Sequence, residues 1–264
     1  MIYIGTSGWQ YRSWRGRFYP GDLPVRLWLD HYAARFATVE VNNAFYRLPD
    51  RRVFEAWREH TPADLVVAVK MSRYLTHIKR LREPAEPVER FFSRASALGS
   101  KLGPVLLQLP PNLRVTALDE LAATLALCPR DVRIAVEPRH ASWWCPAAEE
   151  VLRGHGAALC WADRGSRPVT PLWRTAGFGY LRMHAGRASP EPRYGRTALA
   201  SWLDRLVTAY DVGVSDVFVY FNNDHDAAAI ADAVALAGLA RRRGLPVARV
   251  PSGRSSGLAG ALAG

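Results

Sequence analysis

Residues 38–47 read T-V-E-V-N-N-A-F-Y-R, a stretch that begins like a buried strand and ends in polar and aromatic residues. Val39 and Val41 alternate with Glu40 and Asn42, which is the period-2 pattern of a strand. When the valines face the helices that cover a sheet, the carboxylate and the amide lie on the opposite face. The stretch therefore predicts a strand that carries polar groups inward at its C-terminal end.

Similar apolar runs recur along the chain, and segments with helical periodicity separate them. The predicted strands are residues 2–9, 38–45, 66–73, 103–110, 133–140, 157–165, 178–186 and 216–224. The predicted helices are residues 51–60, 86–100, 117–127, 146–155, 198–210 and 227–243. Repeated strand–helix alternation within 264 residues predicts an α/β fold, a single-domain TIM-type (β/α)8 barrel over residues 1–250. Residues 251–264, rich in Gly, Ser and Ala, are predicted to form a disordered tail.

The composition favours an anionic partner. The formal net charge is +11, and Lys occurs only at positions 70, 79 and 101, so almost all of the basic residues are Arg. A coding bias explains Arg in place of Lys but does not explain the excess of positive charge. We expect nucleic acid, a nucleotide or another phosphorylated molecule as the partner.

The same composition argues against a membrane or secreted location. No run of roughly 18 apolar residues occurs, so a membrane-spanning helix is not expected. The three cysteines show no metal-type pairing, and the first residues lack the features of a secretory signal. The sequence therefore predicts a protein of the reducing cytoplasm.

Polar residues recur near the C-terminal end of nearly every predicted strand when the alternation is applied throughout. The inward-facing set comprises Glu40, Asn42, Lys70, Ser72, Gln108, Glu137, Arg139, Asp163, Arg182, His184, Tyr220, Asn222 and Asp224. Barrel enzymes build their sites at this end. The alternative is a layer of neutralising ion pairs, for instance Glu40 with Lys70, but buried ion pairs are often no more stabilising than apolar packing. We therefore predict a functional site.

Glu137 is the predicted general acid or base, because the stretch V-E-P-R-H places it beside Arg139 and His140 at one strand end. His184 is the second candidate, since imidazole changes charge near neutral pH. Asp163 and Glu40 complete the predicted catalytic set, with Glu40 in a supporting role.

The predicted substrate-binding residues divide into cations, amides and two loops. Cationic side chains suit a phosphate or carboxylate group, and amides and hydroxyls orient a substrate. The loop after the first strand interleaves aromatics with arginines, as does the loop after the third, which is the combination used for single-stranded nucleic acid. The set is Lys70, Arg139, Arg182, Asn42, Gln108, Tyr220, Asn222, Trp9, Tyr11, Arg73 and His77. The alternative for the loops is that their aromatics pack on the barrel rim while the arginines lie in solvent.

A divalent metal is the candidate cofactor. Glu137, Asp163, His184 and Asp224 together supply the oxygen-rich ligands that such ions prefer. The sequence contains no H-x-H, H-E-x-x-H or paired-cysteine spacing in support.

Several long stretches resemble the domain of unknown function 72 family (YecE-like). They are G-T-S-G-W (5–9), E-V-N-N-A-F-Y (40–46), V-K-M-S-R-Y-L-T-H-I-K-R-L (69–81), L-G-P-V-L-L-Q-L-P-P (102–111), V-E-P-R-H-A-S-W (136–143) and V-Y-F-N-N-D (219–224). The resemblance covers about residues 1–243 and implies a TIM-type barrel, but it implies no reaction, because the family carries no established activity. The chain departs from the family at Ala44, usually Thr, and at Ala185, usually Gly.

The residues favour a hydrolase or lyase that acts on a phosphate-containing or nucleic-acid substrate at the C-terminal mouth of the barrel. One alternative is a carbohydrate-active barrel, for which Glu40 and Glu137 would need to lie about 5–10 Å apart. The other is a non-catalytic nucleic-acid or anion-binding protein, driven by basic loop residues such as Arg73, Lys79 and Arg80.

Overall fold

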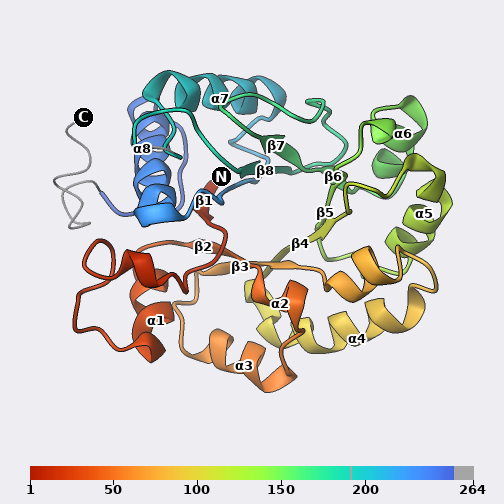
Figure 1. Ribbon diagram of the computed structural model, residues 1–264, viewed down its shortest axis with the longest axis horizontal. Coiled ribbons are helices and arrows are strands. Elements are labelled where there is room, and N and C mark those ends of the chain that lie inside the picture. Colours follow the sequence, from red (N-terminus) through yellow and green to blue (C-terminus); the bar gives the residue numbers. More distant parts are fainter. Residues whose placement is uncertain (191, 253–264) are drawn as a thin grey trace. The chain divides into compact units, whose positions relative to one another are not determined.

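The computed structural model of the protein describes residues 1–190 and 192–252 (Figure 1). Most of the predicted tail, residues 253–264, lies outside the described residues. Among the described residues, every segment predicted as a strand contains one. The strands are β1 (Ile2–Thr6), β2 (Thr38–Val41), β3 (Val66–Lys70), β4 (Leu102–Gln108), β5 (Ile134–Glu137), β6 (Ala158–Leu159), β7 (Trp161–Asp163), β8 (Gly179–Met183) and β9 (Val217–Phe221).

All of the predicted strand segments run past the observed strand ends, and two of them differ further. The segment predicted as residues 157–165 forms two short strands, β6 and β7. The segment predicted as 38–45 stops at Val41, because the chain turns into a helix at Asn43. Asn is a favoured residue at helix starts, so the double asparagine marks the end of the strand rather than its continuation.

The helices match the predicted segments and add two short ones. They are α1 (Trp28–Ala33), α2 (Asn43–Tyr46), α3 (Arg51–Glu59), α4 (Ala85–Ala95), α5 (Leu118–Ala126), α6 (Pro146–Gly154), α7 (Arg196–Ala209) and α8 (Ala228–Arg242). Pro146 opens α6, where its fixed φ suits the first turn. Asp119 and Glu120 lie in the first turn of α5, where the helix dipole favours acidic side chains. In the described part of the chain, no helix combines the length and the apolar character needed to cross a bilayer.

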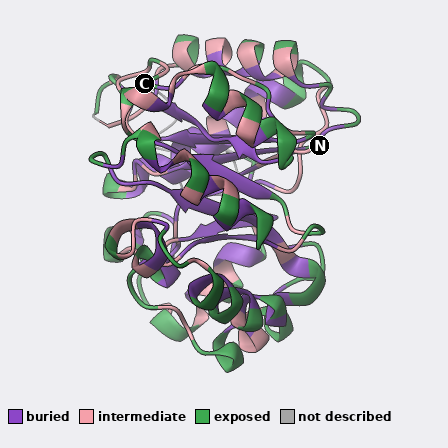
Figure 2. Cartoon of the chain, turned by 90° about the vertical axis from the view of Figure 1, so that its right-hand side faces the viewer, coloured by how far each residue is buried: buried purple, intermediate pink, exposed green. Residues whose placement is uncertain are grey.

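The strands form two sheets, one in the order β1-β9-β8-β7 and one in the order β2-β3-β4-β5-β6. The pairs β1–β9, β3–β4, β4–β5 and β5–β6 are parallel. The strands are almost wholly buried, whereas most of the helices expose one face, and α8 is exposed only at its C-terminal end (Figure 2). This is the pattern of parallel strands covered by helices. The fold is therefore α/β with parallel sheets, and closure into a (β/α)8 barrel remains a prediction.

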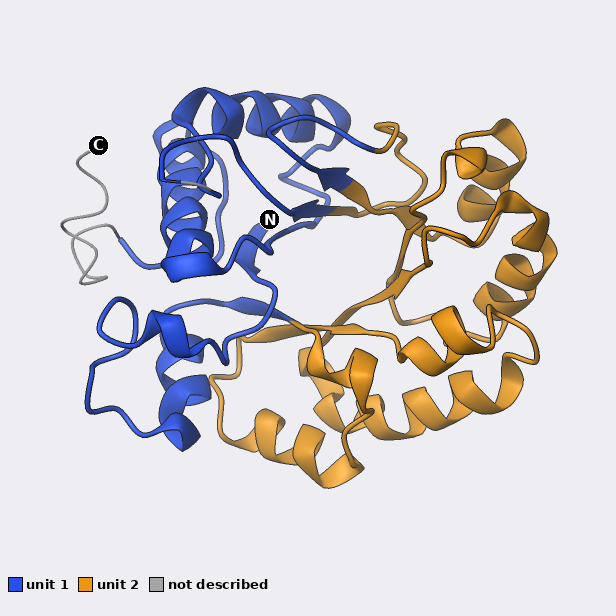
Figure 3. Ribbon diagram, in the orientation of Figure 1, with its two compact units in different colours: residues 1–40, 162–169, 181–264 blue, residues 41–161, 170–180 orange. Residues whose placement is uncertain are grey.

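The chain groups into two compact units (Figure 3). Unit 1 comprises residues 1–40, 162–169 and 181–264, and unit 2 comprises residues 41–161 and 170–180. Unit 1 contains β1, β9, α1, α7 and α8, and unit 2 contains β3 to β6 with α2 to α6. The prediction of one domain over residues 1–250 stays a prediction.

Within unit 1, Gly5 explains how the start of β2 is held. A Cβ atom at Gly5 would clash with the carbonyl oxygen of Thr38, so only glycine allows this approach. The same carbonyl accepts a hydrogen bond from the Tyr32 hydroxyl at 3.0 Å, and the Thr38 hydroxyl lies 2.7 Å from that of Tyr220. These contacts fix the strand that carries Glu40.

Candidate functional site

The carboxyl ends of three neighbouring parallel strands in unit 2 carry a connected set of polar side chains. Lys70 is the last residue of β3, Gln108 of β4 and Glu137 of β5. Lys70 Nζ donates to Gln108 Oε1 at 2.8 Å, and Gln108 Nε2 donates to Glu137 Oε2 at 2.6 Å. Gln108 and Glu137 are paired in register across β4 and β5, so the sheet itself sets their separation. We call Lys70, Gln108, Glu137 and Arg139 the strand-end cluster.

Arg139 lies at the outer end of this cluster. Its Nη2 is 3.5 Å from Glu137 Oε1, and its side chain is 35% exposed, whereas that of Glu137 is 2% exposed. Lys70 and Gln108 are also buried. Buried charges require partners. The Gln108 amide supplies one to each neighbour, because its oxygen accepts from Lys70 and its N–H donates to Glu137. The cluster therefore holds a buried carboxylate with an exposed cation beside it.

An aromatic pair lies against the Lys70 end of the cluster. Lys70 Nζ is 3.9 Å from the centre of the Phe45 ring, within the range of a cation–π interaction. The Phe45 ring meets the His77 ring edge to face, with centroids 4.9 Å apart and planes at 83°. Phe45 belongs to α2, so the unexpected short helix supplies this contact.

His77 is neutral at physiological pH. Burial lowers its pKa from 6.5 to about 4, and the positive charges of Lys70, Arg139 and Arg73 add to this effect. Its Nδ1 lies 2.8 Å from the Thr76 hydroxyl. A neutral imidazole can donate or accept a hydrogen bond, and the cations around it give this region a positive potential.

The segment that carries His77 has an irregular backbone. Tyr74–Ile78 forms a π-helical turn, a feature that is rare and occurs often at functional sites. Arg80, Leu81 and Glu83 then adopt positive φ angles of 53°, 66° and 47°. Such strain persists only where the surroundings fix it. The Arg80 guanidinium donates to the side-chain and backbone oxygens of Asn112 at 3.1 and 3.0 Å, which anchors the segment.

Asn42 precedes α2 as its N-cap residue without a capping hydrogen bond from its side chain. Its Oδ1 is buried and has no hydrogen-bond partner among the described residues. A buried oxygen without a partner can accept a hydrogen bond from a bound ligand. This agrees with the predicted binding role of Asn42, which stays a prediction.

In unit 1, Glu40 forms a two-point ion pair with Arg182. Arg182 Nη2 donates to Glu40 Oε1 at 2.8 Å, and Arg182 Nε donates to Oε2 at 3.0 Å. The side chains are 0% and 2% exposed. The sequence analysis gave Lys70 as an example of a partner for Glu40, and that pairing stays a prediction, whereas within unit 1 Glu40 pairs with Arg182. Because both carboxylate oxygens are engaged, Glu40 is poorly suited to the nucleophile or acid that a glycosidase pair requires.

Asp163 is engaged on both of its oxygens. Its Oδ1 accepts from the Tyr194 hydroxyl at 2.5 Å and from the Ser166 N–H at 3.2 Å, and its Oδ2 accepts from Trp202 Nε1 at 2.7 Å. Burial raises its pKa. We interpret Asp163 as a carboxylate that organises unit 1 rather than one that is open to a ligand.

The residues predicted as metal ligands come from both units, since Glu137 belongs to unit 2, and Asp163, His184 and Asp224 belong to unit 1. Across residues 1–190 and 192–252, no three His, Cys, Asp or Glu side chains are placed to hold an ion together. The hydrogen bonds to Asp163 give one reason, since its oxygens already have donors. The set of Glu137, Asp163, His184 and Asp224 as a metal centre stays a prediction.

Other predicted residues of unit 1 make contacts within that unit. Tyr220 is wholly buried and contacts Thr38. Asn222 Nδ2 lies 3.2 Å from His184 Nδ1. Burial raises the pKa of Asp224, and its backbone carbonyl accepts from Trp14 Nε1 at 3.0 Å. These contacts assign no catalytic role.

The aromatic loop after β1 packs inward. Trp9 is 4% exposed, and its carbonyl accepts from the Tyr19 hydroxyl at 2.6 Å. Tyr19 in turn stacks on Trp28, with ring centres 4.5 Å apart. Tyr11 is half-buried, its hydroxyl donates to the Ser7 carbonyl, and burial raises its pKa. The alternative of packing aromatics thus fits Trp9 better than a surface platform does.

Three contact residues were not predicted from the sequence, namely Phe45, Tyr194 and Trp202. Phe45 stood in the stretch that opened the sequence analysis, but it was assigned to a strand. Tyr194 and Trp202 are 31 and 39 residues from Asp163 along the chain. No local pattern indicates such a pairing.

Solved structures give the fold class. A DUF72 family protein from Thermotoga maritima MSB8 superimposes with a TM-score of 0.77 at 26% identity, covering 91% of this chain and 99% of that chain. A DUF72 family protein from Enterococcus faecalis V583 gives 0.73 at 18% identity, covering 93% and 98%. A xylose isomerase-like TIM barrel/4-hydroxyphenylpyruvate dioxygenase fusion protein gives 0.50 at 15% identity, covering 84% and 43%, and shows likeness of fold alone. The protein is therefore of the α/β class, and its structural matches include a TIM-barrel-like protein.

The family follows from the sequence comparisons. The family model described as "Protein of unknown function DUF72" matches residues 3–255, so the chain belongs to the DUF72 family. The UPF0759 protein YecE of Escherichia coli K12 is 32% identical over 175 residues, which is 64% of this chain and 61% of YecE. The UPF0759 protein YunF of Bacillus subtilis 168 is 27% identical over 257 residues, covering 85% and 89%. The match thus spans less than two thirds of the length of YecE.

Proposed function

We propose that the protein is a hydrolase or lyase acting on a phosphate-containing substrate, and that the strand-end cluster of unit 2 is its reactive centre. One observation carries the proposal. A buried carboxylate, an amide and a buried cation are joined by hydrogen bonds of 2.6 and 2.8 Å at the carboxyl ends of three adjacent parallel strands. Ligands of open parallel sheets and of barrels bind at this end of the strands.

Each residue of the cluster has a chemical role in this proposal. Glu137 is the general base, taking a proton from an attacking water in hydrolysis or from the substrate in elimination. Lys70 and Arg139 stabilise the charge that grows on the phosphate oxygens. Arg73 and the neutral His77 contact the same anionic group. His184 and Asp163, predicted as further catalytic residues, belong to unit 1, and their catalytic roles stay predictions.

A nucleotide or nucleic acid is the proposed substrate class. Tyr46 and Ile78 are highly exposed, and they follow Phe45 and His77, the two rings beside Lys70. An exposed aromatic side chain provides a surface on which a base can stack. The net charge of +11 favours the same class. We also retain closure into a (β/α)8 barrel and a cytoplasmic location as proposals, the latter supported by three cysteines that form no disulfide bond among the described residues.

Replacement of Glu137 tests the function. Glu137→Gln keeps the shape and an acceptor for the Gln108 amide but removes the base, so turnover of nucleotide and phosphodiester substrates is expected to fall by about 100- to 10,000-fold. The melting temperature is expected to stay near that of the unaltered protein. Glu149→Gln, which removes a partly exposed carboxylate from α6, is the control and is expected to leave turnover unchanged.

Two outcomes would contradict the proposal. If the Glu137→Gln variant turns over substrate at nearly the rate of the unaltered protein, Glu137 is not the general base. A protein that turns over none of the phosphate substrates, together with a Glu137→Gln variant that binds them as before, would support the non-catalytic anion-binding alternative.

A further inference from the structure

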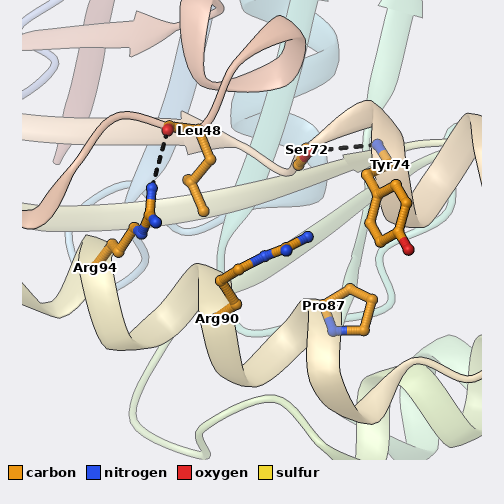
Figure 4. A pocket seen from close by; sticks show the side chains of 6 residues that line it. All are labelled: Leu48, Ser72, Tyr74, Pro87, Arg90 and Arg94. Atoms are coloured by element: carbon orange, nitrogen blue, oxygen red, sulfur yellow. Dashed lines mark hydrogen bonds between the residues drawn. The ribbon is translucent and has the colours of Figure 1, made fainter.

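A cavity of about 210 Å³ lies in unit 2 between α4 and the residues around the π-helical turn. Its walls combine two arginines with an aromatic ring, a hydroxyl and two apolar side chains. The lining residues are Leu48, Ser72, Tyr74, Pro87, Arg90 and Arg94 (Figure 4). None of the four residues of the strand-end cluster is among them.

We propose that this cavity is a binding site for a small organic phosphate, separate from the strand-end cluster. The volume lies below the roughly 300–1,000 Å³ of pockets that hold drug-sized ligands. It corresponds to about seven water molecules at roughly 30 Å³ each. The site therefore fits a phosphate group with a short carbon portion attached.

Arg90 supplies the first anion contact. Its guanidinium lies 5.2 Å from the centre of the Tyr74 ring, and Figure 4 shows the side chain extending between Leu48, Ser72 and Tyr74. Stacking on a ring orients the planar fork of donors. Arg90 also pairs with Glu86 at 3.1 Å on the same helix. Both side chains are largely exposed, and such ion pairs contribute little, so a doubly charged phosphate can replace Glu86.

Arg94 supplies the second anion contact and is already held in place. Its Nη1 donates to the carbonyls of Leu48 and Pro49 at 3.2 and 3.3 Å and pairs with Asp50 at 3.0 Å. All of these contacts use one nitrogen. A guanidinium has five N–H donors, so Nε and Nη2 have no described partner in residues 1–190 and 192–252 and are available to a ligand.

The remaining walls define what else the ligand carries. Ser72 Oγ accepts from the Tyr74 N–H at 3.3 Å, which leaves the Ser72 O–H to donate to a phosphate oxygen. Leu48, Pro87 and the Tyr74 ring present apolar surface. A bare inorganic anion would leave that surface without contact, whereas a phosphate ester would cover it. Phosphate esters are therefore expected to bind more tightly than inorganic phosphate.

Site-resolved NMR titration of the full chain tests the proposal, with phenyl phosphate as the probe. Addition of phenyl phosphate is expected to shift the backbone amides of Ser72, Tyr74, Arg90 and Arg94 along one saturable curve. Phenol, which lacks the phosphate, is expected to leave these amides unmoved, and inorganic phosphate is expected to bind more weakly. Arg90→Ala and Arg94→Ala are each expected to weaken binding by about tenfold or more, because charge-assisted hydrogen bonds are among the strongest.

Arg153→Ala is the matched control. Arg153 pairs with Glu149 four residues away on α6 and is 56% exposed, as Arg90 pairs with Glu86 on α4 and is 46% exposed. Unchanged binding in Arg153→Ala supports a specific site. Equal weakening in Arg153→Ala, unchanged binding in Arg90→Ala and Arg94→Ala, or unmoved amides at Ser72 and Tyr74 would each overturn the proposal. A failed Glu137→Gln test would not affect these readouts.

Discussion

Two carboxylate–arginine pairs, one in each unit, use the same chemical groups in opposite ways. In unit 1, Glu40 and Arg182 meet through two hydrogen bonds of 2.8 and 3.0 Å with almost no exposure. In unit 2, Glu137 is equally buried, but Arg139 touches it at 3.5 Å from a partly exposed position, and an amide occupies the other oxygen. The first pair is closed to a ligand, and the second is accessible from solvent through its arginine.

The comparison shows that burial of a carboxylate does not by itself indicate catalysis. A saturated pair with ideal geometry has its hydrogen-bonding capacity used within the protein. A carboxylate with a weakly held cation retains capacity for a substrate. Variants that break each pair distinguish these roles, since one should affect stability and the other should affect binding.

The largest effect is expected for Arg182→Met. This change leaves the Glu40 carboxylate buried without its cation, which is expected to lower the free energy of unfolding by about 3–5 kcal/mol. Arg139→Met removes the corresponding cation of unit 2, and because that arginine is partly exposed, a loss below about 1 kcal/mol is expected. Urea denaturation measures both. Equal losses in the two variants would show that the pairs do not differ as the geometry indicates.

A smaller effect is expected for Gln108→Leu. Leu is similar in size but makes neither of the hydrogen bonds to Lys70 and Glu137, so two buried charged groups lose a neutral partner. The expected loss is about 1–3 kcal/mol in the free energy of unfolding. Thr38→Val, which removes one neutral hydrogen bond to Tyr220 in unit 1, serves as the reference at about 1 kcal/mol. If urea denaturation shows that Thr38→Val lowers the free energy of unfolding more than Gln108→Leu does, Gln108 does not have this central role.

The smallest expected effect is on the pH dependence of stability. The pKa of His77 is lowered from 6.5 to about 4 in the folded protein, so between these values the unfolded chain binds more protons. The stability associated with His77 is therefore complete above about pH 6.5 and is lost as the pH falls toward about 4. The effect is modest because water screens a partly exposed group.

His77→Gln isolates this contribution. The difference in free energy of unfolding between the unaltered protein and His77→Gln is expected to shrink as the pH falls from about 6.5 to about 4. Burial also lowers the pKa of His31 in unit 1, so His31→Gln should give a difference of the same sign. A His77→Gln difference that stays constant across this pH range would show that His77 is not held neutral by its surroundings.

Alternation along the sequence was sufficient to place polar residues near the strand ends, although the three predicted strands concerned ran two or three residues too far. Lys70, Gln108 and Glu137 were predicted from period-2 patterns alone, and each proves to be the last residue of its strand. The pattern succeeds because side chains on a strand alternate between faces, which is a property of local backbone geometry.

Contact partners could not be predicted in the same way. Arg182 lies 142 residues from Glu40, and a strand pattern assigns each to a face without saying which neighbours meet. The same holds for Asp163, which was predicted as a catalyst before its contacts with Tyr194 and Trp202 were known. The turn at Asn42 is different, because its preference for helix starts was a readable signal that the strand prediction overlooked.

The position of the strand-end cluster separates the residues that the sheet holds in register from the residues that surround them. The spacing of Gln108 and Glu137 comes from hydrogen-bonded backbone register, which tolerates no gradual adjustment, since a slip of one residue turns every side chain to the other face. Arg73, Tyr46 and Ile78 instead lie outside the sheet, where substitutions leave that register untouched. Under the proposed function, substitutions at these positions outside the sheet would alter substrate selection while Gln108 and Glu137 stay where the sheet holds them, so single substitutions would open the site to new substrates.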